Sequence, residues 1–333
     1  MRFGLWVNIQ YPTGSAAIEM ERRLELARMT HQLGFDSFWA GQHFLADPYQ
    51  MLQAVPFLAR LSAEVPGARI GTMVMLLSLY QPVLAAEELA TLDTITGGQL
   101  VCGFAMGYRE IENQALGSPA SERVGRFREA LKIVEGLWKG DVFKFEGRYF
   151  QVPECRPTLL PIQRPRPPIW IAANSDGAVR RAAELGDAWA IAPHSTLPVV
   201  KRQLELYKQS RIETHKAQPT SVPIRREVYV APTAQEAWEQ AAQYLGPKYD
   251  TYRRWGQDRV LPSDDRFSED FSELAKDRFL IGSPDQVRDE LARYEEELGI
   301  TDLMMTSDRA GMPYELAVRN LRLFGEQVIP KLG

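Results

Sequence analysis

Residues 70–104 read IGTMVMLLSLYQPVLAAEELATLDTITGGQLVCGF. The apolar run 70–75 predicts a β-strand, and Pro82 suits the first turn of a helix. The apolar residues of that helix recur three to four positions apart: Ala85, Leu89 and Leu92. A second apolar run, 100–104, follows two glycines. A strand, a helix and another strand in this order predict one crossover unit of a parallel sheet.

The same alternation continues in both directions along the chain. The strands that we predict are 3–7, 37–40, 70–75, 100–104, 169–172, 188–192, 227–230 and 303–305. Eight strand and helix units without a long linker predict an α/β fold of the (β/α)8, or TIM, barrel type. We therefore expect residues 1–333 to form one barrel domain.

Two insertions interrupt this alternation. Residues 141–167 contain two short alternating runs around Glu146-Gly147, which predict a β-hairpin. Residues 246–281 are rich in charged and aromatic side chains, among them Tyr249 and Trp255. We expect this second insertion to form a lid or a loop.

Composition excludes several classes of function. The chain has 45% apolar and 25% charged residues and a formal net charge of −4, without a basic stripe for nucleic acid. Its two cysteines, Cys102 and Cys155, indicate neither a disulfide framework nor a thiolate metal site, and they suit a reducing cytoplasm. The N-terminus lacks the features of a signal peptide, and the most apolar window, 73–80, is too short to span a bilayer.

Two of the four histidines follow predicted strands. The active site of such a barrel lies at the C-terminal ends of its strands, so His43, after the second strand, is a candidate catalytic residue. It could instead be bonded within its loop. His194, after the sixth strand, is a candidate for the substrate pocket or a solvated loop residue. No histidine pair has the spacing of a metal site, so we expect no metal.

A candidate phosphate site follows the fifth strand. It consists of Asn174, Ser175, Asp176, Gly177 and Ala178, directly before a predicted helix. Free amide groups and the positive end of the helix dipole favour a phosphate there. The alternative is simple N-capping by Ser175 or Asp176, and the Asp176 carboxylate would repel a phosphate.

The segment after the fourth strand is Ala105-Met106-Gly107-Tyr108-Arg109. It lacks the glycine spacing of a dinucleotide-binding fingerprint, which argues against a nicotinamide domain of the protein's own. Its glycine would let the backbone approach a flat ligand, so we include Ala105, Gly107 and Tyr108 in the candidate site. Arg109 could meet an anion or form a surface salt bridge.

Several segments, taken together and in order, resemble the bacterial-luciferase-like flavin oxidoreductases. They are 34–39 leading to His43, 70–72, 81–83, 86–87, 92–93, 97–100, 103–108, 182–187, 311–315 and 323–330. Each segment is short, but their joint order spans nearly the whole chain.

The resemblance implies a reduced flavin mononucleotide (FMN) across the barrel mouth, with its phosphate near Asn174 and Ser175. His43 matches the family's catalytic histidine, which assists the reaction of the reduced flavin with dioxygen. The family also implies a non-proline cis peptide bond at Met73-Val74, next to Thr72, as a bulge behind the flavin ring. These three residues therefore join the expected cofactor site.

The chain departs from luciferase itself at three positions. Ala105 and Met106 stand where luciferase has a reactive cysteine and a phosphate-binding arginine, and Gln42 replaces its acidic residue before the histidine. Light emission is therefore not expected. The phosphate charge would have to be met elsewhere, by Arg109 or Arg180.

We expect a two-component monooxygenase, in which a separate flavin reductase supplies reduced FMN and dioxygen oxidises a small organic substrate. One alternative is hydride transfer by a deazaflavin on the same fold. Another is a flavin-binding barrel without catalysis. We expect a homodimer, because barrels with exposed apolar helices commonly form oligomers.

Overall fold

The computed structural model describes residues 1–263, 265–306 and 308–332, so 264, 307 and 333 of the predicted domain lie outside the described part. Within that part, eight parallel strands form a closed ring in the order β10-β11-β12-β14-β1-β3-β5-β7, and β7 pairs back onto β10. These strands are β1 (Arg2–Trp6), β3 (Ser37–Ala40), β5 (Arg69–Thr72), β7 (Leu100–Ala105), β10 (Ile169–Ala173), β11 (Ala188–Ile191), β12 (Pro223–Val230) and β14 (Asp302–Thr306). Each predicted strand has its counterpart, and the (β/α)8 barrel is confirmed.

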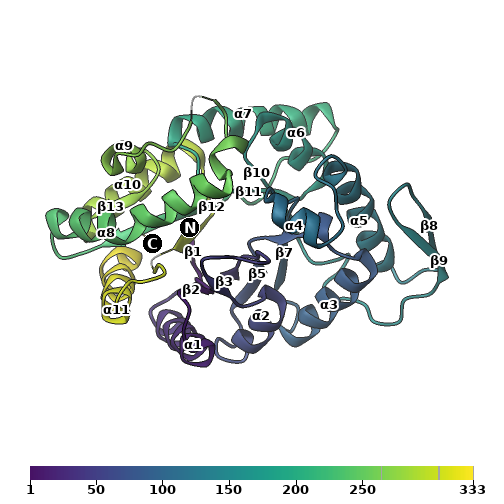
Figure 1. Cartoon of the computed structure of the whole chain (residues 1–333), viewed down its shortest axis with the longest axis horizontal. Helices are drawn as coiled ribbons and strands as arrows, with labels where there is room; N and C mark the ends of the chain where they lie inside the picture. The colour runs from purple at the N-terminus through teal and green to yellow at the C-terminus, as the bar shows by residue number, and fades with distance from the viewer. Residues whose placement is uncertain (264, 307, 333) are drawn as a thin grey trace.

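Helices surround the strands (Figure 1). They are α1 (Ala16–Gln32), α2 (Ala54–Ser62), α3 (Pro82–Ile95), α5 (Arg123–Leu137), α6 (Asp176–Leu185), α7 (Leu197–Glu213), α10 (Pro284–Leu298) and α11 (Tyr314–Leu323). No helix is predicted above after the second or the sixth strand, yet α2 and α7 lie there. In α7 the buried residues recur at helical spacing, but charged residues stand between them. The buried residues are Leu197, Val200, Leu204 and Tyr207.

The barrel interior is filled by large side chains. Trp39 stacks on Trp170 with ring centroids 4.9 Å apart, and the surrounding residues are Trp6, Met73, Val101, Ala188, Ala190 and Met304. A second apolar layer lies between the strands and the outer helices. Because the described interior of the barrel is packed with side chains, a ligand would bind at the mouth of the barrel.

Strand β12 begins at Pro223, four residues before the predicted start at residue 227. The missed residues include Arg225 and Arg226, which interrupt the apolar pattern although both side chains are buried. Charged residues are seldom buried, so a sequence pattern places them outside a buried strand. The early start matters for function because Arg225 faces the barrel mouth.

The second insertion, expected at 246–281 to form a lid or a loop, is mostly helical, so the loop is wrong for its first ten residues. Helix α8 (Ala234–Trp255) continues through Gly246 and Pro247, because the apolar stripe of its first half runs on. The buried residues of that stripe are Ala237, Ala241, Leu245, Tyr249 and Tyr252. After it come the short helices η2 (Gln257–Val260) and α9 (Phe271–Ala275) and strand β13 (Leu280–Gly282).

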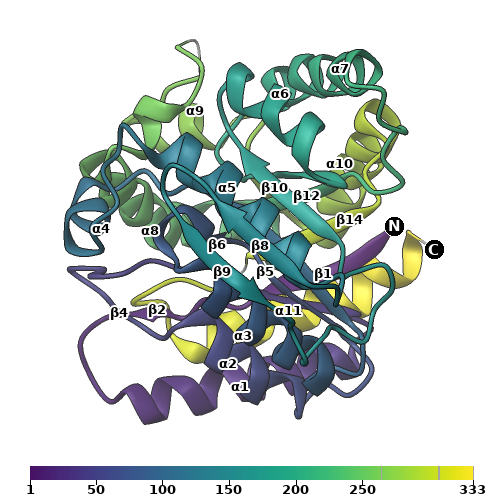
Figure 2. The ribbon, with the colours of Figure 1, turned by 90° about the vertical axis from the view of Figure 1, so that its right-hand side faces the viewer.

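The first insertion contains the predicted hairpin, formed by β8 (Phe143–Glu146) and β9 (Gln151–Cys155). The remaining elements lie near the strand ends: β2 (Gln10–Tyr11), β4 (Gln50–Met51), β6 (Met75–Leu76) and α4 (Glu110–Ala115). In Figure 2, α4 and α8 lie on the side of the molecule opposite the two chain termini. This side is the mouth of the barrel, where the strands end.

Candidate active site

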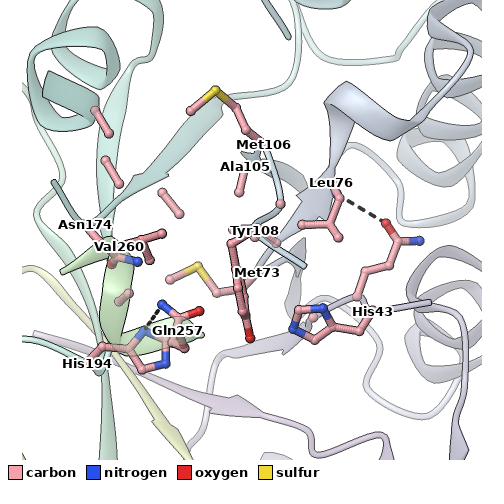
Figure 3. A pocket seen from close by; sticks show the side chains of 18 of the residues that line it. His43, Met73, Leu76, Ala105, Met106, Tyr108, Asn174, His194, Gln257 and Val260 are labelled. Carbon is pink, nitrogen blue, oxygen red and sulfur yellow. Dashed lines mark hydrogen bonds between the residues drawn. The ribbon is translucent and has the colours of Figure 1, made fainter. Parts of the chain in front are cut away.

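A cavity of about 450 Å³ lies at the mouth of the barrel. Its walls come from the strand ends, from α8 and from η2. Most of the predicted site residues line it: His43, Met73, Val74, Ala105, Gly107, Tyr108, Asn174, Ser175, Ala178 and His194. Figure 3 shows His43 and His194 on opposite sides of the cavity, with Met73 and Tyr108 between them. Residues far apart in the sequence thus meet in one pocket.

His43 is held by a carboxylate from another segment. Its Nδ1 lies 2.9 Å from Oε1 of Glu112, a fully buried residue of α4. The same oxygen accepts the backbone N–H of Phe44 at 2.8 Å. Because an ionised carboxylate only accepts hydrogen bonds, Nδ1 carries the hydrogen of the neutral ring. Nε2 is then the atom that can accept a proton, so His43 is more than a residue bonded within its own loop.

The surroundings of His43 favour its neutral form. Burial lowers the pKa of His43 from its ordinary value, and the hydrogen bond and charge of Glu112 oppose this shift. The rings of Tyr108 and Trp255 pack edge-on at 5.6 and 5.4 Å between centroids. A neutral imidazole that is fixed in orientation and shielded by aromatic rings can accept a proton from a bound ligand.

His194 lies in a different environment. It is buried, so the alternative of a solvated loop residue is wrong. Its Nδ1 lies 3.2 Å from the Gln257 amide nitrogen, and its Nε2 has no hydrogen-bond partner within the described part of the chain. Burial lowers the pKa of His194 well below its ordinary value, and four arginines add to the shift: Arg225, Arg278, Arg226 and Arg309.

The segment after β10 has the features of an anion site. Ser175 is the N-cap residue of α6, but its side chain makes no capping hydrogen bond, so simple capping does not account for it. The amide of Ala178 donates to the Ser175 carbonyl at 2.9 Å, which leaves the amides of Asp176 and Gly177 as the first-turn N–H groups that can bind an anion. Ala178 and Arg181, one turn apart on α6, both line the cavity.

Arg123 and Arg181 provide positive charge at this end of the cavity. Neither guanidinium forms an ion pair with a carboxylate among the residues that the structure describes. Arg180, expected above to meet a phosphate, instead points to Glu213 at 3.6 Å on the surface. The arginine that faces the cavity is therefore its neighbour in the sequence.

Four predicted residues do not line the cavity. The Thr72 hydroxyl bonds Gly103, and Gly177 is exposed in the first turn of α6. The Asp176 carboxylate is bound by Arg202 at 2.7 Å and Gln203 at 2.9 Å, which reduces the expected repulsion of a phosphate. The fourth residue is Arg109, which is buried behind the loop that follows His43.

Arg109 neither faces the cavity nor forms a surface salt bridge. It is 6% exposed and donates to the carbonyl oxygens of Phe44 at 2.7 Å and Leu45 at 3.0 Å. Its guanidinium also lies 4.0 Å from the ring centre of Trp255. Because these contacts occupy it, Arg109 fixes the loop after His43 and is not available for a ligand phosphate.

The peptide bond between Met73 and Val74 is cis, as the family resemblance implies. Both residues line the cavity, and the Met73 carbonyl accepts a hydrogen bond from the Trp6 indole at 2.9 Å. Gly103 is required beside them, because a Cβ there would come within 2.0 Å of the Thr72 carbonyl oxygen. The wall that faces a flat ligand is therefore built from backbone as well as side chains.

Sequence reasoning missed several residues of the site. Glu112 could have been noticed, since it lies three positions after Arg109 on a helical segment, where opposite charges pair. Arg181 lies three positions after Ala178 and thus on the same helix face. No local signal marks Arg225 or Tyr252, whose roles depend on strands and helices that are distant in the sequence.

Two further classes of site were sought over the described ranges. No group of three or more His, Cys, Asp or Glu side chains comes together there in a way that could hold a metal ion. No helix in these ranges is long and apolar enough to cross a membrane.

Comparison with known proteins gives the family. The model of the luciferase-like monooxygenase family matches residues 1–302. The oxygenase component of the flavin-dependent trigonelline monooxygenase of Acinetobacter baylyi is 25% identical over 99% of this chain and 95% of its own. An F420-dependent glucose-6-phosphate dehydrogenase of Microbacterium testaceum is 24% identical over 100% and 97%.

A solved structure agrees with these matches. The crystal structure of a monooxygenase from Streptomyces bottropensis has a TM-score of 0.85 and 25% identity, and the match covers 100% of both chains. The family match covers most of the sequence and the structural match covers all of it. The chain belongs to the luciferase-like monooxygenase family of oxidoreductases.

Proposed function

We propose that the protein is the oxygenase component of a two-component monooxygenase. It would take reduced FMN from a separate flavin reductase and use dioxygen to oxidise a small organic substrate. The observation that carries this proposal is that a single cavity joins the His43–Glu112 pair to the unpaired cations and the helix N-terminus at Ser175. The relatedness to the oxygenase component of trigonelline monooxygenase supports it.

The residues present fit a flavin mononucleotide. The first-turn amides of α6, the Ser175 hydroxyl and the guanidinium of Arg181 would hold the phosphate. The backbone wall at Met73-Val74 and the segment Ala105–Tyr108 would pack against the flat ring. When bound, the reduced flavin supplies the electrons that activate dioxygen, so that one oxygen atom enters the substrate and the other leaves as water.

The protein's own contribution is positioning, proton handling and exclusion of water. His43 can accept a proton at Nε2 and return it, while Glu112 fixes its ring and stabilises the charged form. Trp255 of α8 packs against His43, Tyr252 of the same helix lines the cavity beside His194, and Val260 and Leu261 border the cavity at the end of η2. A covered and largely apolar pocket keeps water away from the reacting groups, which limits consumption of dioxygen without oxidation of the substrate.

Titration under anaerobic conditions tests the cofactor. Reduced FMN should bind about 10- to 100-fold more tightly than reduced riboflavin, because only FMN has the phosphate that makes charge-assisted hydrogen bonds. Arg181→Gln should remove most of that difference. Arg180→Gln is the matched control, because Arg180 is next to Arg181 in the sequence but is exposed and pairs with Glu213. Equal binding of FMN and riboflavin would contradict the proposed phosphate site.

The second candidate is a deazaflavin-dependent oxidoreductase that transfers hydride without dioxygen. The relatedness to an F420-dependent glucose-6-phosphate dehydrogenase favours it. The same titration with reduced F420 separates the two, because tight F420 binding without FMN binding would reject the monooxygenase. A barrel that binds reduced FMN but forms no product in single-turnover mixing with dioxygen and a substrate panel would be a non-catalytic flavin-binding protein.

The proposal includes a homodimer in the cytoplasm. Large apolar side chains are exposed on several outer helices, among them Ile18, Leu84 and Ile95. A second copy of the chain could cover such residues. Analytical ultracentrifugation would show a species of twice the 37.7 kDa chain mass if the dimer is correct.

A further inference from the structure

Arg225 is a buried cation on the cavity wall without an anionic partner. It is 6% exposed and lines the cavity from the early part of β12. Its Nε donates to the Thr306 hydroxyl at 2.9 Å, and its guanidinium lies 3.6 Å from the ring centre of Trp6. One terminal nitrogen, Nη2, is buried and has no hydrogen-bond partner among the described residues.

A second buried cation lies close by on α8. Lys248 is 5% exposed, and the oxygen of the Gln10 side-chain amide accepts a hydrogen bond from its ammonium group. The ammonium nitrogen lies 4.7 Å from the ring centre of Tyr252, 5.0 Å from Tyr49 and 5.6 Å from Trp255. Burial lowers the pKa of Lys248 to about 7, and the charges of Arg225 and Arg109 contribute to this shift.

Nearby carboxylates are already engaged. Glu227 is paired with Arg309, and the Asp308 carboxylate lies 3.7 Å from Arg23. Within the described ranges, neither Arg225 nor Lys248 has a carboxylate within 4 Å. Cations removed from water are costly unless an anion pairs with them, and aromatic faces offset only part of that cost. This wall of the cavity therefore lacks a negative charge.

Tyr252 connects the two cations and also lines the cavity. Its hydroxyl interacts with Arg225, and its ring faces the Lys248 ammonium. These groups belong to β12 and α8, whereas the proposed phosphate site belongs to β10 and α6. Trp255 packs against His43 as well as near Lys248, whereas Tyr252 packs against His194 at 5.3 Å, so these groups lie between the two histidines with Lys248 on the His43 side.

We propose that the substrate is a small organic carboxylate, whose carboxylate group binds to Arg225 and the Tyr252 hydroxyl while Lys248 adds a second positive charge. This inference rests on the proposed monooxygenase function and names its substrate class. The unpartnered Nη2 of Arg225 can donate to one carboxylate oxygen while the Tyr252 hydroxyl donates to the other. The remainder of the substrate would then extend toward His43.

Calorimetric titration of the flavin-free protein tests the inference. Benzoate should bind at least about 10-fold more tightly than benzamide, its neutral counterpart of the same shape, because only benzoate pairs with the buried cations. Acetate and acetamide provide the same comparison with smaller probes. Arg225→Gln should weaken benzoate binding at least about 10-fold and change benzamide binding less than about 2-fold. Arg225→Lys should restore part of the preference, since it keeps the charge without the fork.

Controls keep the result interpretable. Arg288→Gln removes a half-buried arginine of the outer helix α10 that is bonded to Asp285 and Asp289, and it should leave the preference unchanged. Lys248→Met is a second variant, which should weaken benzoate binding severalfold even if Arg225 variants do not fold. Equal binding of acids and amides by the wild-type protein, or a preference that survives in Arg225→Gln, would overturn the inference.

A different anion could also use Arg225, namely the ring of the reduced flavin. Anaerobic titration of Arg225→Gln with reduced FMN separates the two sources. Weaker binding of reduced FMN together with an unchanged preference for benzoate would assign Arg225 to the flavin and overturn the substrate proposal. The benzoate titration needs no flavin. Failure of the protein to bind FMN would therefore reject the proposed function, and the benzoate titration would still test whether Arg225 binds a carboxylate.

Discussion

The two sides of the cavity each present a histidine, but the charged side chains around the two histidines differ in sign. His43 follows β3 and has the Glu112 carboxylate 2.9 Å from its Nδ1. His194 follows β11 and is surrounded by the positive charges of Arg225, Arg278, Arg226 and Arg309. Burial lowers the pKa of both side chains, yet only His43 has an anion that favours its protonated form. A position after a barrel strand brings a residue to the cavity, whereas its charged neighbours decide whether it can carry a proton.

The largest expected effect is on catalysis and separates the two histidines directly. His43→Ala should lower the rate of oxygen-dependent product formation about 100- to 1,000-fold, the range for loss of a positioned acid or base. His194→Ala should lower it less than about 10-fold, because a histidine held neutral by burial and by nearby arginines does not transfer the proton. Single-turnover mixing of the reduced, FMN-loaded protein with dioxygen and substrate measures both rates. Similar losses in the two variants would contradict the comparison.

A smaller effect is expected when the anion beside His43 is removed. Glu112→Gln takes away the group that raises the pKa of His43, so this pKa should fall further. The acid limb of the pH profile of kcat/KM should therefore move to lower pH, and kcat should fall about 10-fold as the charged imidazole loses stabilisation. Glu112→Asp should restore part of the wild-type profile. A profile that does not move would limit Glu112 to holding the loop at Phe44.

Local sequence patterns predict the barrel. The predicted bounds of its elements are wrong where a charged or helix-breaking residue lies inside an element. All eight strands were predictable because each is a short apolar run, and most are followed by a helix signal. Strand β12 was located four residues too late because Arg225 and Arg226 are buried inside it. The second insertion was expected to begin at residue 246, but helix α8 runs through Gly246 and Pro247, and its apolar stripe continues to Tyr252. In both places packing of the whole element outweighs a residue that is locally unfavourable there.

The candidate site was predictable where it depends on strand ends and on family resemblance. His43, Ser175 and the cis bond after Met73 are examples, and the first two line one cavity. Arg109 was assigned wrongly, because its sequence position cannot show that backbone carbonyl groups at Phe44 and Leu45 take its hydrogen bonds. Glu112, Arg181 and Arg225 depend on which side chains face each other across the fold, and single-sequence patterns do not contain that information.

The smallest expected effect concerns stability and tests the His194 side alone. The pKa of His194 lies well below its ordinary value of 6.5 in the folded protein, so below pH 6.5 the unfolded chain binds a proton that the folded chain does not. Stability should therefore be lost as the pH falls, and the His194 share of this loss between pH 7 and 5.5 is about 1 kcal/mol. Urea unfolding of His194→Gln at the two pH values should show a correspondingly smaller loss than the wild type. His215→Asn is the matched control, because His215 is exposed and asparagine tolerates its φ of 55°. If His194→Gln and the wild type lost the same stability, His194 would be free to take up a proton in the fold, and the contrast with His43 would fail.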